Sequence, residues 1–389
     1  MRLITRLREL CKPAAVALAA FAFAASAHAQ GPLTLSRLGF FYVGGKMTEF
    51  DGKATMIDHM YVEYMIPARK LHPYPIIMIH GGLRTGVNFL GTLDGKEGWA
   101  QYFVRQGYAV YVVDQVGRGR SPIITQAYGK AEMADARGAI PRYANEEKYN
   151  LWPQAKLHTQ WPGGKDLDSP TVMALTATQA VEISDFHEQQ VLNRDALVTL
   201  IDKIGPSIIL GHSQSGAFLW PVADARPQKV KGILAIEPNG PPAHSVKFIG
   251  PPNWFQYGKL DLAYGLSDVP LTYSPPLNDA SELKFVQEDK PEGPFLARCY
   301  AQAEPARQLP NLKHIPTLVL MSEASYHASY DHCTVNYLRQ AGVNPTFIRL
   351  ADIGIHGNSH MMMLEKNSQQ IAAVIAKWLS DHVRQNMAH

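Results

Sequence analysis

A serine lies in a segment whose residue types and spacing are typical of an enzymatic nucleophile. Residues 211–216 read GHSQSG, and the apolar run Ser207–Leu210 before them predicts a strand. The residues that follow, Ala217–Ala225, predict a helix. A sharp turn between a strand and a helix exposes a hydroxyl at its apex, so we predict that Ser213 attacks an electrophilic carbonyl.

The residues around this serine fit such a turn, with one difference. The positions two before and two after it must be small for the strand and helix backbones to approach, and here they are Gly211 and Ser215. The segment therefore departs from the G-x-S-x-G pattern at its last position, although Gly216 follows at once. The amide of Gln214 begins the helix, where we expect it to face a developing oxyanion.

A serine nucleophile needs a base, for which a histidine after the last strand is the expected position. Residues 351–360 read ADIGIHGNSH and offer His356 and His360. Either imidazole could reach the serine, and residue patterning leaves both open.

The base in turn needs an acid that orients it, and two glutamates are candidates. Glu237 follows the predicted strand Lys231–Ile236, and Glu323 follows the next predicted strand, Thr317–Met321. Patterning alone leaves these two alternatives open as well.

The reaction also needs a second amide to stabilise the oxyanion, and the turn after the predicted strand Pro75–His80 is the right place. That turn contains Gly81 and Gly82, and we expect the amide of Gly82 to be the donor. This chemistry requires no metal and no cofactor.

These positions imply a particular scaffold. Short apolar runs alternate with longer helical patterns, which indicates an α/β fold with a mostly parallel central sheet flanked by helices. Residues 38–44 and 55–66 alternate and predict an antiparallel opening pair. Further strands are predicted at 75–80, 108–114, 207–210, 231–236, 317–321 and 346–350. Helices are predicted at 97–106, 175–204, 217–225 and 368–383.

Two stretches, 122–174 and 241–312, interrupt this alternation. They are rich in Pro, Gly, Trp and Tyr, and loops of such length are uncommon unless they have a function. Because α/β sheets bind ligands at the carboxyl ends of their strands, we expect both stretches to form caps over that edge. Residues 30–389 would then form one catalytic domain with two cap insertions.

The first 29 residues predict a secretory signal peptide. Four basic residues precede an apolar run over 13–25, and residues 27–29 offer a small-x-small cleavage site. The run is shorter than the roughly 20 residues of a spanning helix, so we expect no membrane anchor and a secreted or periplasmic location. Removing four of the 37 basic and one of the 34 acidic residues leaves 33 of each, so nothing suggests a nucleic-acid partner.

The cysteines fit the same compartment. Cys11 lies in the predicted signal peptide, and Cys299 and Cys333 remain. In an oxidising environment this pair favours a single disulfide over two free thiols.

Four segments together resemble a small family of secreted bacterial carboxylesterases of the α/β-hydrolase fold. They are residues 114–121 (DQVGRGRS), 211–216 (GHSQSG), 237–238 (EP) and 354–363 (GIHGNSHMMM). The serine at position 215 is part of this resemblance. The family places its acid after strand six and uses the second histidine of the HGNSH segment, which implies Glu237 and His360.

The resemblance also implies a disulfide and shows one difference. Cys333 corresponds to one end of a family disulfide, so its partner here would be Cys299, which would tie the second insertion to the core. The family pattern can include two adjacent, bonded cysteines in the oxyanion loop, where this chain has Gly82 and Leu83.

The activity implied is hydrolysis of a small-molecule carboxylic ester through an acyl-enzyme on Ser213, with His360 as base and Glu237 as its acid. An amidase, a lactonase or a polyester hydrolase on the same residues is the first alternative. A non-catalytic binding protein on the same scaffold is the second. Arg118 and Arg120 could recognise a substrate carboxylate or could be structural residues of their turn.

Overall fold

A sheet of eight strands organises the chain. The computed structural model describes residues 31–383, so the predicted signal peptide at 1–29 lies outside the described residues, and the architecture below belongs to the unit that begins at Thr34. The strands of the sheet are β1 (Leu35–Phe50), β2 (Lys53–Pro67), β3 (Ile76–Ile79), β4 (Val110–Asp114), β7 (Ser207–Ser213), β8 (Val230–Pro238), β13 (Thr317–Met321) and β14 (Thr346–Arg349). Their order across the sheet is β1-β2-β4-β3-β7-β8-β13-β14.

The strands from β4 to β14 form a parallel sheet, which confirms the predicted fold class. Only the β1–β2 and β2–β4 pairs are antiparallel. All four residues of β3 and all five of β13 are buried, because both faces of the sheet are covered. This burial explains why these strands are unbroken apolar runs in the sequence. Parallel strands end at one edge, so β3, β7, β8 and β13 bring the residues that follow them to the same place.

The opening hairpin is longer than the sequence predicts. β1 and β2 stay paired as far as Phe50 and Lys53, and the turn between them is Asp51-Gly52, with positive φ at both residues. Such a dipeptide is typical of a tight hairpin turn. The prediction stopped early because residues 45–54 do not alternate regularly between apolar and polar types.

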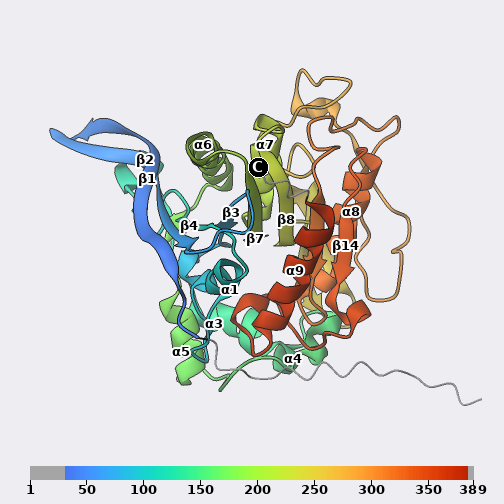
Figure 1. Ribbon diagram of the computed structural model, residues 1–389. Helices are drawn as coiled ribbons and strands as arrows, with labels where there is room; N and C mark the ends of the chain where they lie inside the picture. The colour runs from blue at the N-terminus through green and yellow to red at the C-terminus, as the bar shows by residue number, and fades with distance from the viewer. Residues whose placement is uncertain (1–30, 384–389) are drawn as a thin grey trace, which may run out of the picture. The chain divides into compact units, whose positions relative to one another are not determined.

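Helices cover the sheet on both sides. The longer ones are α1 (Trp99–Arg105), α6 (Phe186–Ile204), α7 (Gly216–Ala225), α8 (Asp331–Gln340) and α9 (Ser368–His382). Helix α6 packs on α7, and α1 packs on α9, and Figure 1 shows these two pairs on opposite sides of the sheet. Ile77 and Ile79 of β3 belong to the apolar cluster that contains Leu197 of α6 and Phe218 of α7. Within the described part of the chain, no helix has the length and apolar character needed to cross a membrane.

The stretch 175–204 does not form one helix, so that prediction was wrong. Helix α5 (Pro170–Ala177) ends within it, and a short strand β6 (Glu182–Ile183) pairs with β5 (Ala131–Glu132). Helix α6 begins only after Asp185, whose side chain accepts a hydrogen bond from the amide of Glu188 at 3.0 Å and caps the helix. The spacing of apolar residues in the sequence continues through this cap, so it predicted one helix where the structure has separate elements.

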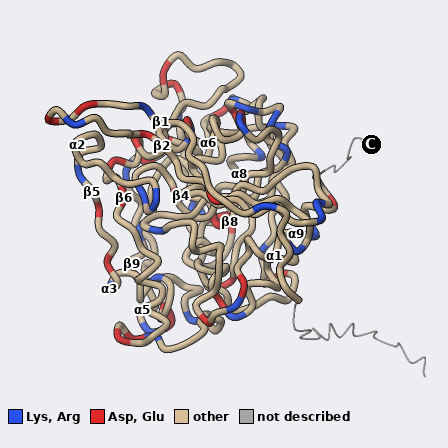
Figure 2. Tube along the Cα trace, turned by 60° about the vertical axis from the view of Figure 1, so that its left-hand side comes forward, with Lys and Arg blue, Asp and Glu red and all other residues tan. Residues whose placement is uncertain are grey.

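The two stretches that interrupt the alternation contain short elements. Residues 122–174 hold α2 (Thr125–Tyr128), β5, α3 (Ala136–Ala139), η2 (Ile140–Ala144), α4 (Glu146–Tyr149), η3 (Pro153–Leu157) and the start of α5. Residues 241–312 hold β9 (His244–Gly250), β10 (Trp254–Leu260), η4 (Ala280–Glu282), β11 (Phe285–Gln287) and β12 (Tyr300–Gln302). Single-turn helices elsewhere are η1 (Gly86–Phe89), η5 (Tyr326–Ser329), η6 (Leu350–Ile353) and η7 (Met362–Leu364). Acidic and basic residues are interspersed along the trace (Figure 2).

A disulfide joins the second of these stretches to α8. Cys299 and Cys333 are bonded, with the sulfur atoms 2.04 Å apart and 34 residues of sequence separation. Both cysteines are buried in a small cluster with Ala297 and Tyr330. The pairing is the one that the family resemblance implied.

Candidate active site

Ser213 is the last residue of β7 and has a strained backbone. Its φ is +57°, in the left-handed region that residues other than glycine rarely adopt. The hydroxyl of Ser215 donates a hydrogen bond to the carbonyl of Ile79 at 2.8 Å. The residue that departs from the G-x-S-x-G pattern therefore ties the turn to the end of β3.

Gly216 allows α7 to start against the end of β8. A Cβ built on Gly216 would lie 2.4 Å from the Cβ and 2.5 Å from the Cα of Pro238, closer than real side chains approach. The amide of Asn239 also donates a hydrogen bond to the carbonyl of Ser213 at 2.8 Å. The turn after β7 and the residues after Glu237 are therefore packed directly against each other.

Glu237 and His360 form a buried pair. The Nδ1 of His360 lies 2.6 Å from Oε2 of Glu237, and both side chains are almost completely buried. The amide of Ser322 donates to Oε1 of Glu237 at 2.8 Å, and the hydroxyl of Ser325 donates to Oε2 at 2.7 Å. Burial raises the pKa of Glu237, and these hydrogen bonds oppose the rise. The hydroxyl of Ser322 also donates to Oε1, so the carboxylate is held by four groups, one of which is the imidazole.

The other two candidates pair with each other instead. The Nδ1 of His356 lies 3.0 Å from Oε1 of Glu323, and the amide of Gly357 donates to Oε2 of the same carboxylate at 2.8 Å. The side chain of His356 is 62% exposed. Both acid–imidazole pairs thus exist, but only the pair made by Glu237 and His360 is buried.

Aromatic side chains enclose the ring of His360. His327 stacks on it with centroids 4.6 Å apart and planes inclined by 6°, and His212 and Tyr326 lie with centroids at 4.4 and 4.7 Å. The Nε2 of His360 is buried and has no hydrogen-bond partner among the described residues. This nitrogen is the one that would take a proton from a serine hydroxyl when Nδ1 is held by an acid.

Positive groups and burial act together on this imidazole. Burial lowers the pKa of His360 well below its usual range, and the neighbouring His327, Arg142 and Arg84 lower it further. Both effects favour the neutral form of the ring, which is the form that can accept a proton.

No hydrogen bond joins Ser213 and His360 among the described residues. Burial raises the pKa of Tyr326, and the nearby Ser213 side chain opposes that rise. The Nε2 of His212 lies 2.9 Å from the carbonyl oxygen of His360, which holds the Ser213 turn against the histidine loop. Proton-transfer contacts of this kind are often loose in the absence of substrate. Tyr326, which no sequence pattern indicated, is thus a neighbour of both side chains.

Gly82, one of the two predicted oxyanion donors, lies next to the side chain of Gln214, the other predicted donor. A Cβ built on Gly81 would lie 2.9 Å from the Cβ of Ser213, and one built on Gly82 would lie 3.3 Å from the side-chain nitrogen of Gln214. In the part of the chain that the structure describes, the amides of Gly82 and Gln214 have no hydrogen-bond acceptor. Both N–H groups are therefore available to a ligand.

Arg118 holds this loop in place. Its buried guanidinium donates hydrogen bonds to the carbonyl of Gly81 at 2.9 Å and to Oε1 of Gln214 at 2.8 Å. It also forms an ion pair with Glu182, whose carboxylate accepts the amide of Leu83 at 2.6 Å. The Arg118–Glu182 pair thus fixes a loop that lacks the adjacent cysteines of the resembling family.

Comparison with known proteins now decides the family. Residues 76–374 match the model of the alpha/beta hydrolase family. The chain belongs to this family. Over 347 residues it is 41% identical to a probable secreted lipase, phiG, of a fungal species (strain ATCC 74256). The aligned residues make up 87% of this chain and 88% of that protein. A solved structure of a novel bacterial esterase shares the fold, with a TM-score of 0.60 and 24% identity over 91% of this chain and 98% of that chain. The chain is a hydrolase similar to lipases and esterases.

The two arginines that follow β4 are structural residues in this alpha/beta hydrolase. Arg120 pairs with Asp114 and Glu63 at 2.8 and 2.6 Å, and its guanidinium lies 3.9 Å from the ring centroid of Tyr61. Since Arg118 is bonded to the oxyanion loop, neither guanidinium is left for a substrate. Of the two interpretations that the sequence allowed, the structural one fits.

A buried network that the sequence did not predict connects residues 122–174 of the hydrolase to its histidine loop. His158 bonds through Nδ1 to Glu146 and through Nε2 to Oε1 of Glu365 at 2.8 Å. The hydroxyl of Ser359 donates a hydrogen bond to Glu146, and the backbone amide of Ser359 donates one to Oε1 of Glu365 at 3.1 Å. Burial would lower the pKa of His158, but the two carboxylates outweigh it and raise the pKa to about 9. The raised pKa favours a charged imidazole between two glutamates, both of which bond to Ser359, the residue before His360.

Three groups of possible metal ligands occur among the described residues of the hydrolase, and each is engaged internally. In the group Glu237, His327 and His360, the first and last are bonded to each other. The group Cys299, His332 and Cys333 contains the disulfide, and in the group Glu146, Glu147 and His158 the histidine bonds to Glu146. None of the three presents a set of free ligands.

Proposed function

We propose that this hydrolase is a serine carboxylesterase whose catalytic residues are Ser213, His360 and Glu237. The observation that carries the proposal is the buried Glu237–His360 pair, in which Nε2 has no partner among the described residues and the ring of His360 lies with its centroid 4.4 Å from that of His212, the residue before Ser213. A serine, a carboxylate and an imidazole, in this order along the chain, are the groups that acyl transfer on this fold requires.

The proposed reaction has two steps. Nε2 of His360 takes the proton of Ser213 as the serine oxygen attacks the ester carbonyl, and the amides of Gly82 and Gln214 donate hydrogen bonds to the oxyanion. His360 then gives the proton to the leaving alcohol, and Glu237 stabilises the imidazolium in between. Water hydrolyses the acyl-enzyme by the same proton transfers in reverse.

The proposal extends to domain organisation and location. Residues 122–174 and 241–312 would act as caps that select a small-molecule ester, since the first of them contributes Glu146 and His158 to the support of the histidine loop. Residues 30–389 would be the mature catalytic domain, secreted or periplasmic after removal of residues 1–29. The similarity to a protein named as a secreted lipase and the disulfide support this location.

The test compares the wild-type enzyme with Ser213→Ala on a panel of esters, amides and lactones of matched acyl length. We expect ester hydrolysis by the wild type and a loss of about a thousandfold or more in kcat for the variant, with unchanged far-UV circular dichroism. A fluorophosphonate should label Ser213 in the wild type only. Near-normal turnover by Ser213→Ala would contradict the proposal. A wild type that cleaves amides or lactones but not esters would show that the enzyme is an amidase or a lactonase instead of a carboxylesterase.

A further inference from the structure

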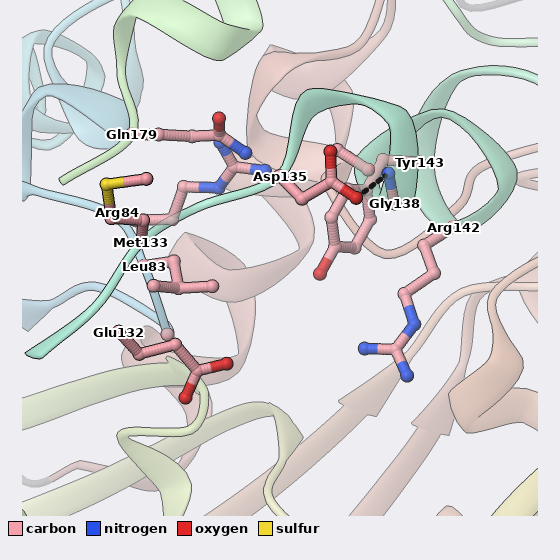
Figure 3. A pocket seen from close by; sticks show the side chains of 11 residues that line it. Leu83, Arg84, Glu132, Met133, Asp135, Gly138, Arg142, Tyr143 and Gln179 are labelled. Atoms are coloured by element: carbon pink, nitrogen blue, oxygen red, sulfur yellow. Dashed lines mark hydrogen bonds between the residues drawn. The ribbon is translucent and has the colours of Figure 1, made fainter. Parts of the chain in front are cut away.

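A pocket of about 360 Å³ lies beside the proposed oxyanion donor Gly82 (Figure 3). Its walls come from the turn after β3, which contributes Leu83 and Arg84, and from the first insertion, which contributes Arg142 and Tyr143. The proposed catalytic steps use neither arginine, so the two guanidinium groups require another explanation.

Arg84 is buried in the pocket wall without a counter-ion. Only 3% of the residue is exposed, and within the described chain its guanidinium makes one hydrogen bond, from Nη1 to the carbonyl of Leu175 at 3.2 Å. The guanidinium also lies 5.3 Å from the ring centroid of Tyr143. No carboxylate of the described residues forms an ion pair with it. Because a buried charge is costly unless it is paired, its remaining N–H donors are suited to an anion that enters the pocket.

Arg142 places a second cation in the lining of the pocket. Its guanidinium lies 5.7 Å from the ring centroid of Tyr326, which packs against the ring of His360 with centroids 4.7 Å apart. Among the described residues Arg142, too, forms no ion pair with a carboxylate, whereas Arg118 and Arg120 are both paired. Arg84, which is buried, and Arg142, which is exposed, are therefore two cations without a paired carboxylate among the described residues, and both lie close enough to His360 to lower its pKa.

Two acidic residues also line the pocket, but neither neutralises these arginines by contact. The carboxylate of Asp135 accepts the amides of Arg137 and Gly138 at 2.9 and 3.1 Å, at the start of α3. Glu132 is exposed, and Figure 3 shows it at the opposite end of the pocket from Arg142. The charge of the two arginines is thus left for a ligand.

We propose that this pocket binds a carboxylate of the substrate, so that the preferred substrates are esters with an anionic group close to the scissile bond. The inference rests on the proposed function, because Ser213 and Gly82 define where the scissile bond lies. Guanidinium groups suit a planar carboxylate, to which each can donate two parallel hydrogen bonds. The carboxylate could belong to the acyl part, as in a half-ester of a dicarboxylic acid, or to the alcohol part.

The test uses two matched pairs of esters that distinguish these sources. Monoethyl glutarate is compared with its neutral amide isostere, ethyl 4-carbamoylbutanoate, and butanoyloxyacetate is compared with butanoyloxyacetamide. The measured quantity is the anion preference, defined as kcat/KM for the anionic ester divided by kcat/KM for its neutral isostere. We expect a preference of about ten- to a hundredfold in at least one pair, as a charge-assisted hydrogen-bond pair would give.

Three variants assign the preference to the pocket. Arg142→Gln should reduce the anion preference by about tenfold, and Arg142→Lys should retain part of it because it keeps the charge. Arg137→Gln is the matched control, since it removes an exposed positive charge from the same insertion outside the pocket lining. Its anion preference should equal that of the wild type.

Two results would overturn the inference. One is a wild-type enzyme without an anion preference in either pair, and the other is an equal effect of Arg142→Gln and Arg137→Gln. In both cases, turnover of the neutral esters that disappears in Ser213→Ala would leave the proposed function standing. Turnover that persists in Ser213→Ala would instead refute the proposed function.

Discussion

Glu237 and Glu323 differ in surroundings far more than in sequence context. Glu237 is the last residue but one of β8, Glu323 comes just after β13, and each contacts a histidine, but Glu237 is fully buried and accepts hydrogen bonds from Ser322 and Ser325. The Glu323–His356 pair is partly exposed to solvent, where an ion pair contributes little. Because Glu237 is buried, its carboxylate can orient an imidazole rigidly, whereas Glu323 belongs to a surface loop.

This difference predicts opposite outcomes for two substitutions of the same kind. Glu237→Gln should lower kcat/KM for ester hydrolysis by about a thousandfold or more, because the amide neither fixes the required tautomer of His360 nor stabilises its cation. Glu323→Gln should change kcat/KM by less than about threefold, because its partner His356 lies on the surface. Steady-state kinetics of both purified variants provide the comparison. A larger loss in Glu323→Gln would assign the acid to the other strand.

The environment of His360 predicts an unusual pH dependence. Since burial first and then His327, Arg142 and Arg84 lower the pKa of His360, the neutral base persists at lower pH than a free imidazole would. The value of kcat/KM for a neutral ester should therefore stay constant from pH 8 to below pH 6.5. In Arg142→Gln the pKa of His360 should rise, so the acidic limb of the profile should move to higher pH. A limb that moves to lower pH, or that does not move, would show that the charge of Arg142 does not reach the imidazole.

The sequence located these residues to different extents. Patterning predicted Ser213 as the nucleophile and left two histidines open as the base, and only the family resemblance favoured Glu237 and His360. Arg84, Arg142 and Tyr326 carried no motif, because their importance arises from where a turn and an insertion meet in the fold. A lone arginine in a loop gives no sign that it lacks a counter-ion.

At the scale of elements, the first insertion is tied to the histidine loop by a buried charge. His158 follows η3, and its partner Glu365 lies 207 residues further along the chain, just after the loop that carries His360. Because Ser359 bonds to Glu146 and Glu365, the residue before the proposed base is held by this network. The insertion therefore positions the histidine loop.

The network predicts how stability depends on pH. The pKa of His158 is raised from its usual 6.5 to about 9, so the folded state binds this proton more tightly than the unfolded chain does. The stabilisation is complete below about pH 6.5 and is lost as the pH rises through about 9. It amounts to about 3 kcal/mol, from the size of the shift. Urea unfolding of the wild type at pH 6, 8 and 10 should show a fall that His158→Gln lacks.

His187 supplies the control for this measurement. It is an exposed histidine that pairs with Asp268 at 3.0 Å, so His187→Gln should leave the pH dependence of the unfolding free energy as in the wild type. If the two variants have the same pH dependence, the buried imidazole is not charged in the folded state.

Elements with strong local signals were predicted well and those without them were not. The buried strand Thr317–Met321 has the predicted bounds, because the four apolar residues in a row that follow Thr317 allow little else. The insertions, by contrast, are built from single helical turns and two- or three-residue strands that have no period long enough to detect. The error at 175–204 has a local cause as well, since Asp185 is a cap residue inside an apolar pattern.

At the scale of the whole molecule, the second insertion is held by a covalent bond. The disulfide joins Cys299, the residue before β12, to Cys333 in helix α8. The first residues of α8 lie beside His327 and Tyr330. These residues pack in turn near His360. The link therefore connects the outer insertion with the core that carries the proposed base.

Removing this link should destabilise the fold without abolishing the catalytic groups. The bond restricts a loop of 34 residues in the unfolded chain, which is worth about 3–4 kcal/mol in the chain-entropy model. The double variant Cys299→Ser with Cys333→Ser should unfold at correspondingly lower urea concentration than the oxidised wild type. Reduction of the wild type with dithiothreitol should reproduce the shift. An unchanged midpoint in both experiments would mean that the insertion is held by packing alone.

Gly216 and Pro238 set a boundary for anyone who recombines this enzyme with its relatives. The helix that follows the proposed nucleophile starts directly on Pro238, the residue that follows the proposed acid. Because a side chain at position 216 would collide with Pro238, the two residues should be taken from the same parent sequence. A chimera whose crossover falls between residues 216 and 238 separates them, whereas one whose crossover falls after residue 239 keeps them together. The permitted crossovers of such a library are therefore dictated by one glycine that takes no part in the chemistry.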